Sequence, residues 1–101
     1  MRTILFFDLP SVSSKDTREY TRFVKTIKKE GFVMLQESVY TKLSINQFTA
    51  ESSIKKIRSL LPPEGFVSVL LITEKQFASM INLLGESKSD VIATDEKEIF
   101  L

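Results

Sequence analysis

Asp8 is the residue near the start of the chain whose type and position could serve chemistry, because it ends an apolar run and is followed at once by Leu9 and Pro10. The chain contains neither histidine nor cysteine. Disulfides, thiolate nucleophiles, imidazole bases and zinc or copper sites are therefore excluded. Catalysis could use only carboxylates, hydroxyls and lysines, and a bound metal would be a hard ion with oxygen ligands, such as magnesium.

Two interpretations of Asp8 stay open from the residues alone. A carboxylate is uncommon within a strand, and the end of a central strand often carries a functional group. An aspartate before Leu-Pro-Ser can also simply accept backbone N–H bonds in a turn, and the sequence alone favours this structural role. One carboxylate is a poor magnesium site, because the ion usually takes one or two together with water and phosphate. A symmetric dimer that joined two copies of Asp8 would remove that objection.

A second candidate feature is a row of cations on the first expected helix. The row consists of Lys15, Arg18, Arg22, Lys25 and Lys29. Their spacing places them within an arc of roughly 80° and along about 21 Å of helix, enough to meet several phosphates of a duplex. Most charged faces are merely solvated, but those usually mix signs, because like charges repel. An arc without acids therefore favours phosphate binding.

The composition bounds the class of protein. At 101 residues the chain predicts one domain, with 43% hydrophobic and 27% charged residues, an ordinary composition for a folded, soluble protein. No apolar run approaches the roughly 20 residues that span a bilayer, so no membrane partner is expected and a cytoplasmic location is the default. The net charge is +1, so nucleic-acid binding must depend on how charge is distributed.

The first half of the chain alternates strand and helix signals. Residues 4–7 predict a central strand buried on both faces. A helix follows, capped by Ser13 or Ser14 and ended at Gly31. Its apolar stripe is Tyr20, Phe23, Val24 and Ile27. Residues 32–42 then predict a single second strand, kinked around 36–38.

The second half repeats the pattern. A helix is expected over about 46–61 and must end at the pair of prolines that follows. A strand begins after Gly65, and a capping box at Thr73 predicts a third helix that closes at Gly85. Its apolar stripe is Phe77, Met80, Ile81 and Leu84. The tail combines polar residues 86–90, apolar residues 91–93, an acidic run and apolar residues 99–101.

This alternation predicts an α/β (α+β) sandwich, with one mainly antiparallel sheet covered by helices on one face. A ferredoxin-like arrangement over residues 1–84 is the preferred fold. Residues 85–101 would form a C-terminal extension whose strand pairs with a partner or packs on its own sheet. A small doubly wound parallel sheet is the alternative.

The order of these features resembles the small spacer-acquisition family of CRISPR-associated proteins, Cas-two. The resemblance lies in a strand ending at Asp8, a basic helix, Gly31 and then the string Gln36-Glu37-Ser38-Val39-Tyr40. The later string GFVSVLLITEKQFASMINLLGE resembles members from type II-A systems. The match covers nearly the whole chain and weakens after Gly85. The cations of the first helix are more spread out than the adjacent arginines common in the family.

The resemblance implies a ferredoxin-like homodimer that sits between two dimers of the CRISPR integrase and holds a double-stranded prespacer DNA across its basic surface. It also implies a metal-dependent nuclease activity on RNA or double-stranded DNA, with Asp8 as catalytic residue and Mg²⁺ ligand. The strand bearing Gln36, Ser38, Val39 and Tyr40 would help to form the dimer. Because no histidine is available, hydrolysis would need two Asp8 carboxylates to hold the ion. The scaffold is the preferred physiological role.

Two other classes remain as alternatives. One is a ribonuclease toxin of the virulence-associated D type, which shares this architecture. The other is a non-catalytic ferredoxin-like nucleic-acid-binding module, which usually exposes aromatic rings on its sheet for base stacking. Phe6, Phe7 and Phe66 lie in runs so apolar that we expect them to be buried, which ranks this module last.

Overall fold

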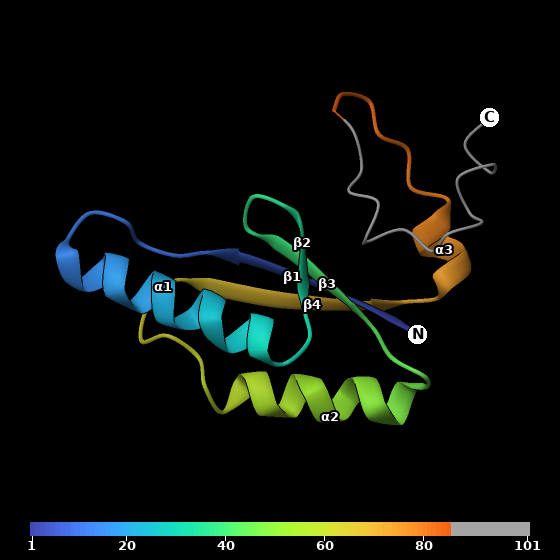
Figure 1. Ribbon diagram of the computed structural model, residues 1–101, viewed down its shortest axis with the longest axis horizontal. Coiled ribbons are helices and arrows are strands. Elements are labelled where there is room, and N and C mark those ends of the chain that lie inside the picture. The colour runs from blue at the N-terminus through green and yellow to red at the C-terminus, as the bar shows by residue number, and fades with distance from the viewer. Residues whose placement is uncertain (86–101) are drawn as a thin grey trace.

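The computed structural model describes residues 1–85 (Figure 1), so the expectations for 86–90, 91–93, 99–101 and the C-terminal strand lie outside the described residues. The elements in chain order are β1 (Arg2–Asp8), α1 (Ser14–Lys29), β2 (Val33–Gln36), β3 (Val39–Leu43), α2 (Gln47–Arg58), β4 (Phe66–Ile72) and α3 (Glu74–Ala78). Across the described part, no helix has the length and apolar character needed to cross a membrane.

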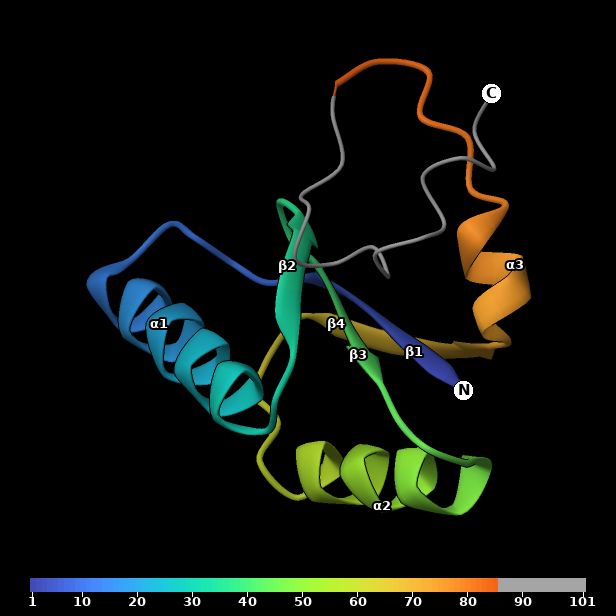
Figure 2. The ribbon, with the colours of Figure 1, turned by 45° about the vertical axis from the view of Figure 1, so that its right-hand side comes forward.

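The four strands form one sheet in the order β2-β3-β1-β4, and every neighbouring pair is antiparallel. The two long helices, α1 and α2, lie on the same side of this sheet (Figures 1 and 2). This order and the β-α-β-β-α-β connectivity are those of a ferredoxin-like fold. The preferred fold prediction is confirmed, and the parallel alternative is wrong.

The main core lies between the sheet and the two long helices. Leu5 and Phe7 point from β1 toward this side, where Phe23 and Ile27 of α1 are fully buried. The Phe7 ring meets the Phe23 ring edge-on at 5.3 Å between centroids and stacks on Tyr40 at 5.7 Å. Because β1 pairs on both edges and carries the centre of this core, its end at Asp8 is held by the most constrained strand of the sheet.

Helix α1 begins and ends where the sequence predicts. Ser13 caps it, since its hydroxyl accepts the Asp16 N–H while the Asp16 carboxylate accepts the Ser13 N–H, a reciprocal capping box. Gly31 follows the helix at φ +96°, in the left-handed region that glycine adopts without steric cost. The apolar stripe and the caps together fix the direction of the helix across the sheet.

The single strand expected over residues 32–42 is wrong, because the structure has two strands there. β2 and β3 pair as a hairpin with Gln36 opposite Val39, and the turn between them contains Ser38 at φ +63°. The turn also contacts the central strand, since the Phe7 N–H donates to the Ser38 carbonyl oxygen at 3.1 Å. The predicted kink is therefore a complete reversal of the chain.

Two helix ends also differ from the prediction. α2 stops at Arg58 rather than at Leu61, and α3 stops at Ala78, well before Gly85. Ser79 ends α3, because its N–H and hydroxyl both satisfy carbonyl oxygens of the last turn. Ile81 beyond it is exposed, so the continued apolar stripe has nothing to pack against among the described residues.

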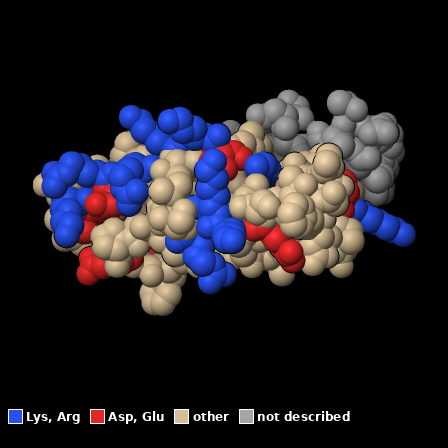
Figure 3. All heavy atoms as spheres, turned by 90° about the horizontal axis from the view of Figure 1, so that it is seen from below, with Lys and Arg blue, Asp and Glu red and all other residues tan. Residues whose placement is uncertain are grey.

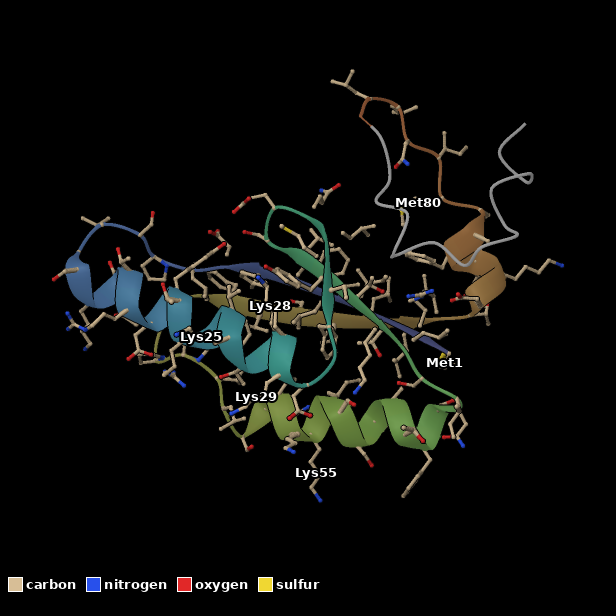
Figure 4. All side chains as sticks on the ribbon, viewed as in Figure 1. Met1, Lys25, Lys28, Lys29, Lys55 and Met80 are labelled. Carbon is tan, nitrogen blue, oxygen red and sulfur yellow. The ribbon has the colours of Figure 1, made fainter. Side chains whose placement is uncertain are left out.

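The other side of the sheet is only partly covered. Short α3 packs there through Phe77 against Ile4, and Met80 just beyond the helix joins this cluster (Figure 4). Away from α3, Phe6 is 40% exposed and Phe66 is 76% exposed. The expectation that Phe6, Phe7 and Phe66 are all buried holds for Phe7 and is wrong for the other two. Edge strand β4 has no partner beyond it among residues 1–85, which leaves Phe66 open to solvent.

Candidate functional site

The structure places Asp8 at the exposed end of the central strand. Its register partner on β4 is Phe66, and alternation along β1 puts its side chain on the same side of the sheet as Ile4 and Phe6. Within the described part of the chain, the Asp8 carboxylate makes no hydrogen bond and no ion pair. The turn role favoured by the sequence, in which this carboxylate accepts backbone N–H bonds, is therefore not seen there.

A free carboxylate at a strand end can supply a hard oxygen ligand. Among residues 1–85 there is no group of three or more acidic side chains that could hold an ion together. One protomer therefore offers a single ligand, and magnesium commonly takes one or two carboxylates and completes its shell with water and phosphate oxygens. The donor chemistry fits magnesium, provided that a second Asp8 or a phosphate contributes.

The row of cations on α1 is exposed along its full length. Lys15, Arg18, Arg22, Lys25 and Lys29 are all solvent-accessible, and Lys28 adds a further exposed cation near the C-terminal end. Seen from the side of α1 and α2, lysine and arginine atoms spread over this face and crowd where the end of α1 meets α2 (Figure 3). The structure thus gives a side rich in cations, in several groups, opposite the apolar side that carries Asp8.

Not every member of this row is equally available to a ligand. The Arg22 guanidinium is paired with Glu19 of the same helix at 2.7 Å. Asp16, which interrupts the basic start of the helix, belongs to the capping box: the Ser13 and Val12 backbone N–H groups hold the pKa of its carboxyl below its ordinary value. The remaining cations of the row have no ion-pair partner in residues 1–85.

Helix α2 contributes cations that the sequence analysis missed. Lys55, Lys56 and Arg58 occupy its last turn. The Lys56 ammonium pairs with Glu30, which follows α1, at 3.2 Å, whereas Lys55 points away from the sheet into solvent (Figure 4). The signal in the sequence was the Lys-Lys-x-Arg string, which alone indicates only cations suited to a helix C-terminus. Their closeness to the α1 row is a tertiary feature.

The four residues expected at a dimer interface occupy different environments. Gln36 and Ser38 lie at the hairpin turn, and Val39 lies on the same side of the sheet as Phe6, its register partner. Tyr40 points to the opposite side and is buried in the core of its own protomer, where desolvation raises the pKa of its hydroxyl. Of the four, Val39 has the side chain best placed for a contact across the open sheet.

The fold and the site define a small ferredoxin-like protein with a cationic helical side and a carboxylate at the end of its central strand. The family model described as CRISPR associated protein Cas2, the Cas-two family of the resemblance, matches residues 1–80. The chain belongs to this family.

Relatives support the same assignment over the whole chain. A protein from Treponema denticola is 46% identical over 101 residues, which is the full length of both chains. One from Ligilactobacillus salivarius is 42% identical, again over the full length of both. One from Streptococcus mutans is 39% identical over all of this chain and 93% of its own length. Each of the three is named CRISPR-associated endoribonuclease Cas2.

Proposed function

We propose that this protein acts in CRISPR adaptation as a homodimeric scaffold that holds a double-stranded prespacer DNA between two integrase dimers. The observation that carries the proposal is the division of the protomer into two sides. A cationic side is formed by α1 and the end of α2, and an apolar sheet side lies opposite. The first suits a polyanion, and the second suits a second copy of the chain. A cytoplasmic location stays a prediction.

The cationic side supports duplex binding through charge and length. Lys15 and Lys29 lie at the two ends of the α1 row, about 21 Å apart along the helix, and a duplex presents one negative charge about every 1.7 Å of its axis. Contacts of this type position a duplex without reading its sequence. A protein that must accept prespacers of any sequence needs contacts of this kind.

The open sheet side supports self-association. Phe6, Val33, Leu70 and Phe66 are large apolar residues that stay exposed across the strands of this side. Stacking two such sheets would remove apolar surface from water, which favours association by about 25 cal/mol for each Å². The exposed Phe6 and Phe66 rings would also suit base stacking, but their register partners, Val39, Ser68 and Asp8, include no cation. That composition favours a second protomer over a nucleic-acid strand.

A magnesium-dependent nuclease activity at Asp8 is the second part of the proposal, because the relatives above are named endoribonucleases. Asp8 of each protomer would hold the ion through a carboxylate oxygen, while the cations of the helical side retain the nucleic acid. Bound magnesium lowers the pKa of a coordinated water and neutralises phosphate charge. Among residues 1–85 no group of three or more acidic side chains is present that could supply a general base beside the metal ligand, so the scaffold is preferred as the physiological role.

The test is an integration assay with the cognate integrase, a short duplex and either the wild-type protein or Asp8→Ala. We expect the variant to stimulate integration as well as wild type, since a scaffold does not need the carboxylate. A parallel assay with single-stranded RNA and duplex DNA should show magnesium-dependent cleavage by wild type and none by Asp8→Ala. Loss of stimulation in a variant that still dimerises and binds duplex would make metal chemistry essential and contradict the scaffold.

A ribonuclease toxin of the virulence-associated D type remains the alternative and makes the opposite prediction. Expressed without an integrase, a toxin would arrest growth, and Asp8→Ala would relieve the arrest. The scaffold predicts growth at the normal rate in both cases. The non-catalytic module predicts that Asp8→Ala changes neither integration nor cleavage, because wild type would show no activity in either assay.

A further inference from the structure

The residue that borders the backbone of Asp8 just before the neighbouring strand β4 is a glycine. Gly65 comes directly before Phe66, the register partner of Asp8, so it lies beside the point where the chain leaves β1. A Cβ atom built on Gly65 would come within 2.7 Å of the Asp8 carbonyl oxygen and 2.8 Å of the Leu9 Cδ2 atom. Real Cβ atoms essentially never approach another heavy atom this closely. The Asp8 backbone can therefore occupy its position only because residue 65 has no side chain.

The conformation of Gly65 adds a second requirement. Its φ is +106°, a region that residues with a Cβ atom rarely adopt. Of the other described glycines, Gly31 has a similar φ of +96°, but a Cβ there would meet only the flexible end of the Lys42 side chain, at 3.3 Å. A left-handed φ is thus shared by all three described glycines, Gly85 included at +89°, while the close approach to Asp8 belongs to Gly65.

The Asp8 carboxylate has no partner of its own in the described residues, so the backbone sets its position. On one edge the strand is held through the Phe7 N–H and the Ser38 carbonyl oxygen, at 3.1 Å. On the other edge Gly65 borders Asp8, and the following Pro10 favours an extended backbone at Leu9. A shift at residue 65 would therefore pass directly to the carboxylate.

We propose that Gly65 is a positioning residue for Asp8: it lets the end of β4 approach the end of β1 closely and so fixes where the Asp8 carboxylate presents its oxygens to a hard divalent cation. The inference rests on the proposed magnesium role of Asp8. Gly65 touches no substrate and takes no part in the chemistry. It acts only through the backbone of the residue that binds.

The experiment titrates Mg²⁺ alone into isotope-labelled protein and follows the NMR signals of Asp8 and Leu9 in wild type, Gly65→Ala, Gly31→Ala and Asp8→Asn. We expect Gly65→Ala to raise the magnesium dissociation constant about tenfold or more, the size usual when the support of a metal ligand is lost. Gly31→Ala imposes the same left-handed strain away from Asp8 and should stay close to wild type. Thermal unfolding of both variants measures the strain separately.

A purely structural role for Gly65 predicts that both alanine variants lose stability and neither loses magnesium affinity. That result in folded Gly65→Ala would overturn the inference. Failure of the proposed metal role would give a different result. The NMR signals of wild type would then not respond to Mg²⁺, or those of Asp8→Asn would respond equally. Either outcome would also remove the basis for a role of Gly65.

A second variant keeps the test decisive if Gly65→Ala does not fold. In Leu9→Ala/Gly65→Ala the Leu9 Cδ2 atom is gone, so one of the two closest contacts is relieved while the approach to the Asp8 carbonyl oxygen remains. We expect this variant to show the same loss of magnesium affinity relative to Leu9→Ala alone. Equal affinities in that pair would count against the inference.

Discussion

At the scale of single residues, the two aspartates near the start of the chain differ in what holds their carboxylates. The Asp16 carboxylate accepts the Ser13 and Val12 backbone N–H groups, both at 3.1 Å, and so stabilises the first turn of α1. The Asp8 carboxylate has no such partner among the described residues. Its charge is therefore free to meet a cation, whereas the charge of Asp16 is used within the fold.

This difference predicts a pH dependence for Asp16. Its pKa is lowered below the ordinary value of 3.8, so the folded state binds the proton less readily than the unfolded state. The stabilisation is then complete above the unfolded pKa and is lost as the pH falls through the folded pKa. Thermal unfolding should show wild type more stable than Asp16→Ala at neutral pH. This difference in stability should disappear as the pH falls through the folded pKa of Asp16. An equal gap in strong acid would contradict this account.

At the scale of elements, α3 is attached to the sheet by one buried cation. The Arg2 Nε donates to a Glu74 carboxylate oxygen at 2.9 Å, and the guanidinium carbon lies 4.2 Å from the centre of the Phe77 ring. The Arg2 side chain is 5% exposed and that of Glu74 is 32% exposed. The short helix therefore depends on a pair whose two members differ greatly in their access to water.

The difference in burial predicts an asymmetry between the two partners. Glu74→Gln leaves the Arg2 charge buried without a counter-ion and should lower the free energy of unfolding by about 2 kcal/mol. Arg2→Met keeps apolar contact with Phe77 and leaves Glu74 partly hydrated, so its loss should be smaller. Urea unfolding monitored by circular dichroism measures both. A larger loss in Arg2→Met would show that packing, rather than the buried charge, dominates.

The two long helices support a second prediction at this scale, because only some of their cations form ion pairs among residues 1–85. Lys29→Ala/Lys55→Ala removes two exposed charges that have no ion-pair partner among residues 1–85, one from each helix. Duplex affinity should fall, and the slope of its logarithm against log salt should decrease by about two. Fluorescence anisotropy with a labelled duplex over a range of salt concentrations measures both quantities.

A matched control removes the same amount of charge from the same two helices. Arg22→Ala/Lys56→Ala takes away cations that are paired with Glu19 and Glu30. Its effect on affinity and salt slope should be clearly smaller, since these charges are already partly neutralised. Equal effects of the two double variants would mean that net charge alone, and not the free cations, governs binding.

At the scale of the whole molecule, the open sheet side predicts the oligomeric state. Leu70 is 52% exposed on β4 and faces the same side as Ile4, its register partner. Leu70→Asp would place a charge within a stacked interface and should weaken self-association about 100-fold or more, because an unpaired charge buried in an interface is costly. Light scattering across a concentration series should then report a monomer.

The control for this prediction is Val12→Asp, which adds the same charge to an exposed apolar position in the loop before α1. That variant should associate as wild type does. A Leu70→Asp protein that associates unchanged would mean that the apolar side is not the contact between protomers. The basic sides of the two protomers would then be related by a different contact, which would change the surface available for a prespacer.

Local patterns were sufficient for most of the elements. The stripe of Phe23 and Ile27 identified α1, since helical periodicity is carried by a few neighbouring residues. The hairpin was missed because Gln36-Glu37-Ser38 lacks the glycine or asparagine usual in a tight turn, and Ser38 takes the left-handed conformation instead. The third helix was overestimated because an apolar stripe shows what could be buried, not whether a surface is present to bury it.

The sequence by itself determined the fold class, the family, the absence of imidazole and thiolate chemistry, and the cationic face of α1. These depend on residue types and on short-range periodicity, both of which are present in the sequence without three-dimensional information. Only the tertiary structure decided which side of the sheet carries Asp8 and Phe66, that α2 extends the basic surface, and that Gly65 borders Asp8. Each of these depends on strand order and helix placement, which bring together residues far apart in the chain.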